Sequence, residues 1–248
     1  MNIITPVIFN LPLFEEVVQI GSRNLKEISM ASFKKAGYQV HTCEGQHAVR
    51  EDLFPLISQH EIRYLSCVGH GNPWILTGEN FATILESDDQ TSYDVASGMV
   101  IVALSCSVGA HLAQELVDHG AVTVFAYKED FVLSNDPDDE KYFLLPHCTI
   151  DTSIADGMTT GDAYKMSQAM WEQAYNSCQD PFAKCWIWND WKNQDIFGRT
   201  DVRILPKDPE LDPDPPTPGI SPWIYLGIGI VIVVAALAIS KFFKLRGG

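Results

Sequence analysis

Short apolar runs alternate with longer amphipathic stretches along the first half of the chain. The short runs are typical of buried strands, and the stretches between them place apolar residues at helical spacing. Strands are predicted at 2–9, 38–42, 62–68, 99–104 and 121–127, and helices at 13–35, 47–60 and 108–119. Gly37 and Gly120 follow two of these helices and favour their termination there. Strands that alternate with helices predict an α/β fold with a mostly parallel sheet flanked by helices.

The second half of the chain carries weaker signals. It contains a helical pattern at 160–175, a cluster of Trp186, Trp188 and Trp191 that we expect to close the core, and an edge strand at 202–205. A long polar segment spans 72–97, and an acidic stretch at 130–141 is predicted as a loop. The acidic stretch could bind calcium through Asp136, Asp138, Asp139 and Glu140, but its spacing differs from that of an EF-hand, which favours a solvated loop.

The C-terminal tail differs in kind from the rest of the chain. No residue from 223 to 240 is charged, and a run of this length can cross a bilayer. Trp223 and Tyr225 before it, and three basic residues after it, are typical interfacial anchors. The predicted organisation is therefore an α/β domain at 1–205, a Pro/Asp-rich linker at 206–222, one transmembrane helix at 223–243 and a short basic tail at 244–248.

Acidic residues dominate the part that precedes the predicted anchor. Residues 1–222 contain 14 Lys and Arg against 32 Asp and Glu, a net charge of −18. Such a charge repels nucleic acid, which we exclude as a partner, and attracts basic ligands. The six cysteines do not form the spacing of a disulfide framework, and the N-terminus does not resemble a signal peptide. The basic tail favours the opposite membrane orientation, but we expect a single-pass protein with its large domain facing the cytoplasm.

Two predicted strands end next to residues that form a catalytic pair in many hydrolases. His70 follows the strand at 62–68, and Cys106 follows the strand at 99–104. The carboxyl ends of parallel strands meet at one edge of a sheet, where ligands bind, so we expect the imidazole and the thiol to lie close together. A thiol activated by an imidazole is the nucleophile of cysteine hydrolases. The helix predicted just after Cys106 would favour its thiolate.

Backbone amides near this pair complete the predicted site. The N–H groups of Gly71 and Cys106 are candidates for an oxyanion hole. Ser105 and Ser107 are interpreted as hydrogen-bonding neighbours of the thiol. The alternative is a zinc site at Cys67 and His70, but Cys67 should face the other side of its strand and no second ligand pair is present. We therefore expect no metal and no cofactor.

Three motifs resemble the caspase–gingipain class (clan CD) of cysteine peptidases, closest to its gingipain-type (C25) and CHAT branches. They are GHG at 69–71, SCSVG at 105–109 and GAVTVFAYKEDF at 120–131. A helix start at 161–163 is similar to a further motif of these families, and the resemblance covers roughly residues 1–205. It implies a caspase-like α/β fold. The caspase pentapeptide Gln-Ala-Cys-x-Gly is absent, so aspartate specificity is not implied.

By this resemblance, His70 is the general base or ion-pair partner, Cys106 the nucleophile and Gly71 an oxyanion-hole donor. The expected function is a membrane-anchored cysteine peptidase that cleaves peptide bonds through an acyl-enzyme, with a protein or peptide substrate near the bilayer. Activation of a membrane-associated protein is one such role.

Residues around the predicted pair suggest how substrate is bound. Trp74, Glu129 and Asp130 are predicted to bind substrate, and the two acids favour a basic residue before the scissile bond. Glu79 is a candidate third residue that orients the histidine. The alternative function is a catalytically inactive caspase-like module, tethered to the membrane, that binds a protein partner.

Overall fold

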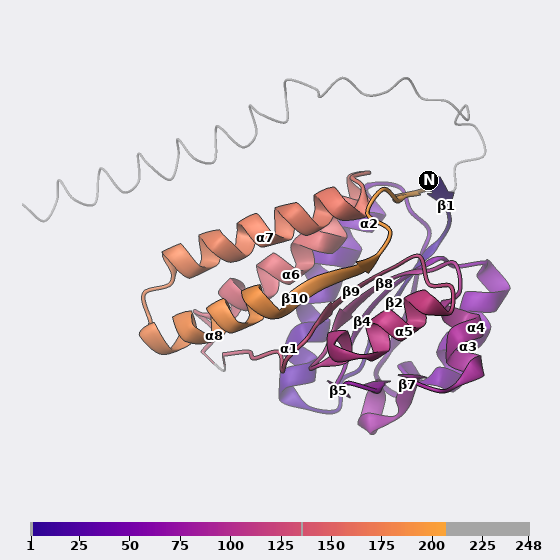
Figure 1. Ribbon diagram of the computed structural model, residues 1–248, viewed down its shortest axis with the longest axis horizontal. Coiled ribbons are helices and arrows are strands. Elements are labelled where there is room, and N and C mark those ends of the chain that lie inside the picture. The colour runs from indigo at the N-terminus through magenta and orange to yellow at the C-terminus, as the bar shows by residue number, and fades with distance from the viewer. Residues whose placement is uncertain (1, 135, 207–248) are drawn as a thin grey trace, which may run out of the picture. The chain divides into compact units, whose positions relative to one another are not determined.

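A six-stranded sheet organises the part of the chain that the computed structural model describes, residues 2–134 and 136–206 (Figure 1). The strand order is β10-β9-β8-β4-β2-β3, and neighbours are parallel except for β10, which runs antiparallel to β9. The strands are β2 (Val7–Leu11), β3 (Val40–Glu44), β4 (Tyr64–Val68), β8 (Val100–Leu104), β9 (Thr123–Tyr127) and β10 (Gln194–Gly198). The predicted α/β fold with a mostly parallel sheet is thus confirmed.

Helices cover both faces of this sheet because successive strand residues point to opposite sides. One apolar cluster, which includes Phe9 and Tyr64, packs against α1, α2, α6, α7 and α8, and the other, which includes Ile8 and Leu65, packs against α3, α4 and α5. The helices are α1 (Glu16–Asn24), continued by a π-helical turn (Leu25–Met30) and α2 (Ala31–Lys35), α3 (Arg50–His60), α4 (Gln90–Ala96), α5 (Leu112–Asp118), α6 (Glu140–Ala155), α7 (Thr160–Ser177) and α8 (Pro181–Asn193).

The first predicted strand is in fact two strands separated at Pro6. β1 (Asn2–Ile4) pairs in parallel with β11 (Arg203–Leu205), outside the central sheet, and β2 begins after the proline. Proline has no backbone N–H to donate to a neighbouring strand. The N–H of Thr5 still reaches the carbonyl of Leu205 at 3.1 Å, so the chain changes sheets at this point.

The polar segment at 72–97, for which no strand or helix was predicted, contains most of a small antiparallel sheet and a helix. β5 (Gly71–Asn72), β6 (Ile75–Thr77) and β7 (Thr83–Glu86) form the sheet, and α4 follows. Leu76, Ile84 and Leu85 are buried within it. This small sheet directly follows β4 and therefore supports the loop that carries His70.

The sequence pattern also failed to predict β10, α6 and α8. Ten of the 16 residues of α6 are buried, and the helix packs along α7. Tyr64 and Ser66 of β4 donate hydrogen bonds to the buried carboxylate of Asp151 in α6. Of the three tryptophans predicted to close the core, only Trp191 packs against it. Trp186 and Trp188 on α8 are 49% and 51% exposed.

The membrane-spanning prediction concerns a different part of the chain. No helix within the residues that the structure describes is long and apolar enough to span a membrane. The predicted transmembrane helix at 223–243, the basic tail at 244–248 and nearly all of the linker at 206–222 lie outside the described residues.

Candidate active site

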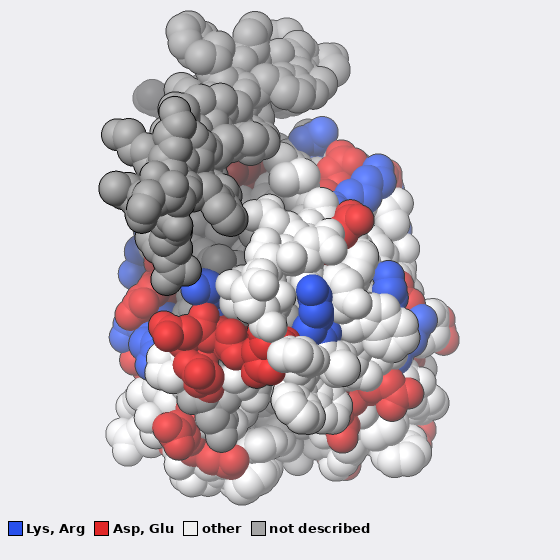
Figure 2. Space-filling view, turned by 90° about the vertical axis from the view of Figure 1, so that its left-hand side faces the viewer, with Lys and Arg blue, Asp and Glu red and all other residues white. Residues whose placement is uncertain are grey.

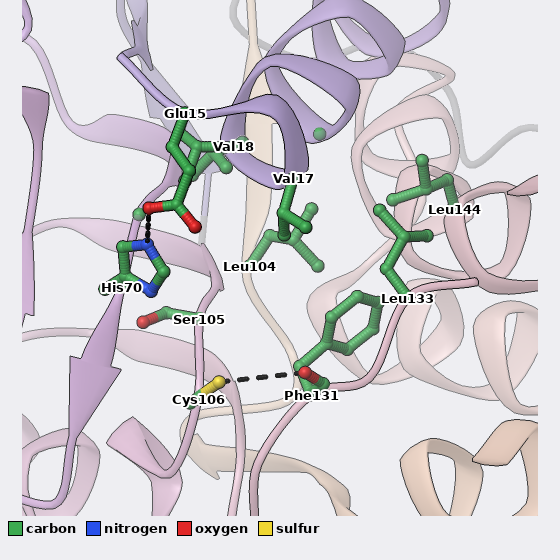
Figure 3. A pocket seen from close by; sticks show the side chains of 13 residues that line it. Glu15, Val17, Val18, His70, Leu104, Ser105, Cys106, Phe131, Leu133 and Leu144 are labelled. Carbon is green, nitrogen blue, oxygen red and sulfur yellow. Dashed lines mark hydrogen bonds and ion pairs between the residues drawn. The ribbon is translucent and has the colours of Figure 1, made fainter. Parts of the chain in front are cut away.

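His70 and Cys106 occupy equivalent positions beyond two neighbouring strands. Val68 of β4 is paired with Leu104 of β8, and each candidate residue lies two positions further along its own strand. Both side chains line one cavity of about 210 Å³ at the carboxyl edge of the sheet (Figure 3). The structure therefore brings together the two residues that the sequence pattern singled out.

Glycines let the His70 loop approach neighbouring backbone closely. A Cβ atom at Gly69 would overlap the carbonyl group of Thr77, and a Cβ at Gly71 would lie 2.7 Å from the carbonyl oxygen of Cys106. Thr77 also holds the loop directly, since its N–H and its hydroxyl donate to the carbonyl of His70 at 2.9 and 3.0 Å. The Gly71 backbone therefore lies close to the backbone carbonyl of Cys106.

A third residue, Glu15, orients the histidine. Its Oε2 lies 2.9 Å from His70 Nε2, and the imidazole stacks on Phe81 with ring centroids 4.9 Å apart. The other ring nitrogen, Nδ1, points toward Ser105 and Cys106 (Figure 3). Sequence reasoning missed Glu15. The available signal was an acidic residue near the start of the helix predicted at 13–35, which follows the first predicted strand.

Glu79, the residue predicted for that role, has a different partner. Its carboxylate accepts a hydrogen bond from the N–H of Leu13 at 2.5 Å. It therefore secures the segment that leads into Glu15.

The Cys106 thiol is partly buried and donates a hydrogen bond to a backbone carbonyl. Its sulfur lies 3.7 Å from the carbonyl oxygen of Phe131, to which it donates. Burial raises the pKa of this thiol above its usual value, and the Asp130 and Asp190 carboxyls raise the pKa further, although the Phe131 hydrogen bond opposes them. The expected stabilisation of a thiolate by a helix is wrong, because only a short 3₁₀ turn follows at Val108–Ala110 and α5 starts at Leu112.

Ser107, the residue after Cys106, adopts a left-handed backbone conformation and is hydrogen-bonded to the segment that follows β9. Ser107 has φ 55°, a region that non-glycine residues enter infrequently. Its N–H donates to the carbonyl of Glu129 at 3.0 Å, and its hydroxyl donates to Asp130 at 2.8 Å. Ser105 lies on the other side of the thiol, and its buried hydroxyl has no hydrogen-bond partner within the described residues.

The residues predicted to bind substrate lie outside the cavity. Glu129 and Asp130 hold Ser107 and are not among the residues that line the cavity. Trp74 is 56% exposed and its ring lies near His111, with centroids 6.5 Å apart. Their role in binding substrate stays a prediction.

The zinc alternative at Cys67 and His70 finds no support in the geometry. Cys67 is buried in the apolar cluster on the α3, α4 and α5 side of the sheet, whereas His70 lines the cavity. Among the residues that the structure describes, no group of three or more His, Cys, Asp or Glu is arranged to hold a metal ion. All six cysteines are free thiols.

Comparison with known proteins provides evidence about the fold alone. No family model and no curated protein matches the sequence. Among solved structures, the chain is similar to one in the complex of Porphyromonas gingivalis RgpB pro- and mature domains, with a TM-score of 0.53 and 12% sequence identity. The match covers 79% of this chain and 47% of that one, so the chain spans about half the length of its structural neighbour. This coarse similarity agrees with a caspase-like fold.

Proposed function

We propose that this chain is a cysteine peptidase in which Cys106 attacks the substrate carbonyl, His70 transfers the proton and Glu15 orients the imidazole. The observation that carries the proposal is the shared cavity, which is lined by the thiol, the imidazole and its carboxylate partner. Nucleophile, base and orienting group are the three parts that activated-nucleophile catalysis needs. The gingipain whose fold the chain resembles adds coarse support for a peptidase.

The raised pKa of the Cys106 thiol determines how the first step would proceed. Because the thiol starts protonated, its proton moves to Nδ1 of His70 as the Sγ–C bond forms. The C–N bond then breaks as His70 gives that proton to the leaving amine. Water attacks the thioester, His70 takes the water proton, and the acid product leaves with the thiol restored.

Backbone amides would stabilise the charge that develops on the substrate oxygen. The N–H groups of Gly71 and Cys106 are the proposed donors, and the close approach of Gly71 to the Cys106 backbone supports this role. The thiol must also leave its hydrogen bond with the Phe131 carbonyl to attack. Substrate that displaces the Phe131 segment would therefore promote the reaction.

The predicted anchor would hold this peptidase at a bilayer with the large domain on the cytoplasmic side. Its uncharged run and flanking aromatic and basic residues support a single-pass helix. In that position its substrates would include proteins at or near the membrane.

Cleavage of a diverse peptide library by the full-length chain in detergent, read by mass spectrometry, tests the proposal. We expect cleavage products from the wild type, none from Cys106→Ala, and a rate lower by about 10²–10⁴-fold from His70→Ala. Cys185→Ala removes an exposed thiol and is the matched control that should keep full activity.

The alternative is an inactive tethered module that binds a partner in the same cavity, and the raised thiol pKa favours it. Peptides that bind the wild type but stay intact would support this alternative. Equal cleavage by the wild type and Cys106→Ala would exclude Cys106 as the nucleophile.

A further inference from the structure

The cavity beside the Cys106 thiol is lined mostly by apolar side chains, with Glu15, His70 and Ser105 as its polar residues. The apolar side chains come from α1, from the ends of β4 and β8, from the segment after β9 and from α6, and include Val17, Val68, Leu104, Phe131, Leu133 and Leu144. Figure 3 shows Val17, Leu104, Leu133 and the Phe131 ring gathered on one side of the thiol and His70 on the other. The elements that form the proposed catalytic pair thus also enclose an apolar space.

A glycine in α1 keeps this space open. A Cβ atom at Gly21 would lie 2.9 Å from Cγ1 of Val68 and 3.2 Å from Cδ2 of Leu104, both of which line the cavity. A larger residue at this position would push its neighbours into the space or fill part of it.

The charged groups near the cavity already have partners. Glu15 is the single carboxylate among its described lining residues, and that carboxylate bonds His70. Asp130 is outside the lining and accepts from Ser107. A basic side chain that entered the cavity would lose water without gaining a free carboxylate, which is costly.

We infer that this cavity binds the apolar side chain of the substrate residue whose carbonyl carbon Cys106 attacks, with Leu, Met and Phe as the preferred residues. The inference rests on the proposed peptidase function and names its substrate class. It differs from the basic residue that the sequence pattern favours. Because Cys106 and His70 line the same cavity, the side chain next to the attacked carbonyl is the part of a peptide that lies within its reach.

The size of the cavity fits such side chains. Its volume is about 210 Å³. An apolar cavity of about 150 Å³ is enough to hold benzene. Differences of one methylene in an apolar pocket change kcat/KM by roughly 10- to 200-fold, so the preference should be large enough to measure.

Peptidyl acyloxymethyl ketones test the inference on the full-length chain in detergent. The probes share one cap and one peptide sequence and differ only in the residue before the ketone: Leu, Met, Phe, Gly, Arg, Lys or Asp. Labelling forms a thioether to Cys106 as the acyloxy carboxylate leaves, and the thiol proton passes through His70 to solvent. We expect Leu, Met or Phe probes to label Cys106 at least about tenfold faster than Arg, Lys, Asp or Gly probes.

Two leucines provide a matched pair of variants. Leu133→Asp places a carboxylate in the cavity wall and should slow the Leu probe and speed the Arg probe. Leu145→Asp makes the same change at an exposed position outside the cavity and should leave the wild-type order unchanged. Thermal melting of both variants checks that they fold. Gly21→Ala should reduce labelling by the Phe probe more than labelling by the Gly probe.

The outcomes separate this inference from the function on which it rests. Fastest labelling of Cys106 by an Arg, Lys or Asp probe would overturn the apolar assignment and leave the cysteine peptidase standing. Failure of every probe to label Cys106, in a chain whose melting is cooperative, would overturn both. An identical response of Leu133→Asp and Leu145→Asp would contradict the assignment of the cavity.

Discussion

Glu15, His70 and Cys106 come from three separate segments. His70 and Cys106 lie two residues past the ends of β4 and β8, and Glu15 directly precedes α1. The residue types of His70 and Cys106 and their glycine neighbours identified these two as a candidate pair. The contact of Glu15 with His70 was not predicted, because it depends on β2 lying beside β4. Strand order is a property of the folded sheet and cannot be read from local sequence.

Replacement of Glu15 by glutamine tests the orienting role. Glu15→Gln keeps the shape of the side chain but removes the charge that holds His70 Nε2, so kcat for a peptide substrate should fall at least about tenfold, within the roughly 10²–10⁴-fold that a positioned acid–base group contributes. Glu16→Gln, an exposed neighbour in the first turn of α1, is the control. Equal kcat values for the two variants would remove Glu15 from the mechanism.

The close approach of Gly71 to the Cys106 backbone leads us to predict that a side chain at position 71 lowers activity. An alanine at position 71 would meet the Cys106 carbonyl oxygen at 2.7 Å and also overlap the Ser105 hydroxyl. Gly71→Ala should therefore separate the two proposed oxyanion donors and lower kcat by about 10²-fold or more.

A double variant supplies the check on that explanation. Ser105→Ala in the Gly71→Ala chain removes the overlap with the hydroxyl but leaves the clash with the carbonyl oxygen, so activity should recover only in part. Full activity in Gly71→Ala alone would contradict the proposed donor pair.

The charge of Asp130 affects the pKa of the Cys106 thiol, although Asp130 does not line the cavity. Asp130 raises the pKa of Cys106, so Asp130→Asn, which can still accept from Ser107, should lower the pKa of the thiol. A larger thiolate fraction makes alkylation by iodoacetamide faster at neutral pH. The pH profile of Cys106 alkylation measures this shift toward lower pH. Asp138→Asn, on an exposed loop, should leave the profile unmoved, and a shift toward higher pH in Asp130→Asn would contradict the prediction.

The helices and strands whose apolar residues recur at a clear spacing were predicted from the sequence. Elements without such a spacing were missed. The parallel strands are apolar runs buried on both faces, which gives a strong pattern. Helix α6 is buried on most of its circumference and includes Pro146, His147 and Asp151, so its sequence has no clear apolar stripe. Its helical state follows from packing between the sheet and α7.

His147 links α6 to β9 and makes the stability of the fold depend on pH. The hydroxyl oxygen of Tyr127 lies 3.1 Å from His147 Nδ1 and accepts a hydrogen bond from the Gln194 amide. The hydroxyl proton of Tyr127 is therefore available to the imidazole. Burial lowers the pKa of His147 from 6.5 to about 3. The unfolded chain then binds the proton more strongly, and stability falls as pH drops below about 6.5.

This pH dependence is measured by chemical unfolding of the wild type and His147→Gln. Relative to the variant, the wild type should lose about 2 kcal/mol of unfolding free energy between pH 6.5 and pH 5. His47→Gln changes an exposed histidine and should retain the wild-type slope. Parallel curves for the wild type and His147→Gln would show that His147 does not cause the slope.

At the scale of the whole molecule, the excess of negative charge acts over the longest distance. The sequence carries a formal net charge of −15. Figure 2 shows acidic side chains gathered into a broad group on one face, with basic side chains scattered singly. Within the described residues, burial and then the charges of Asp136 and Asp180 raise the pKa of Asp139, so these three carboxyl groups lie near one another. Such a field attracts cationic peptides.

Salt should therefore affect cationic substrates selectively. For a peptide with lysines remote from the scissile bond, kcat/KM should fall several-fold between about 10 and 100 mM ionic strength, because the Debye length shortens from about 30 to about 10 Å. A peptide with glutamines in place of these lysines is the control. Equal salt dependence of the two peptides would show that the acidic surface does not steer substrate.

The sequence by itself determined the alternation of strands and helices, the excess of acid and the pair His70 and Cys106, because periodicity, charge and local motifs are properties of neighbouring residues. Only the tertiary structure decided that Glu15 contacts His70 and that Pro6 divides the first strand between two sheets. It also decided that burial raises the pKa of the Cys106 thiol and that mostly apolar side chains line the cavity beside it. Each of these depends on segments far apart in the chain, whose contacts and burial arise when the sheet assembles.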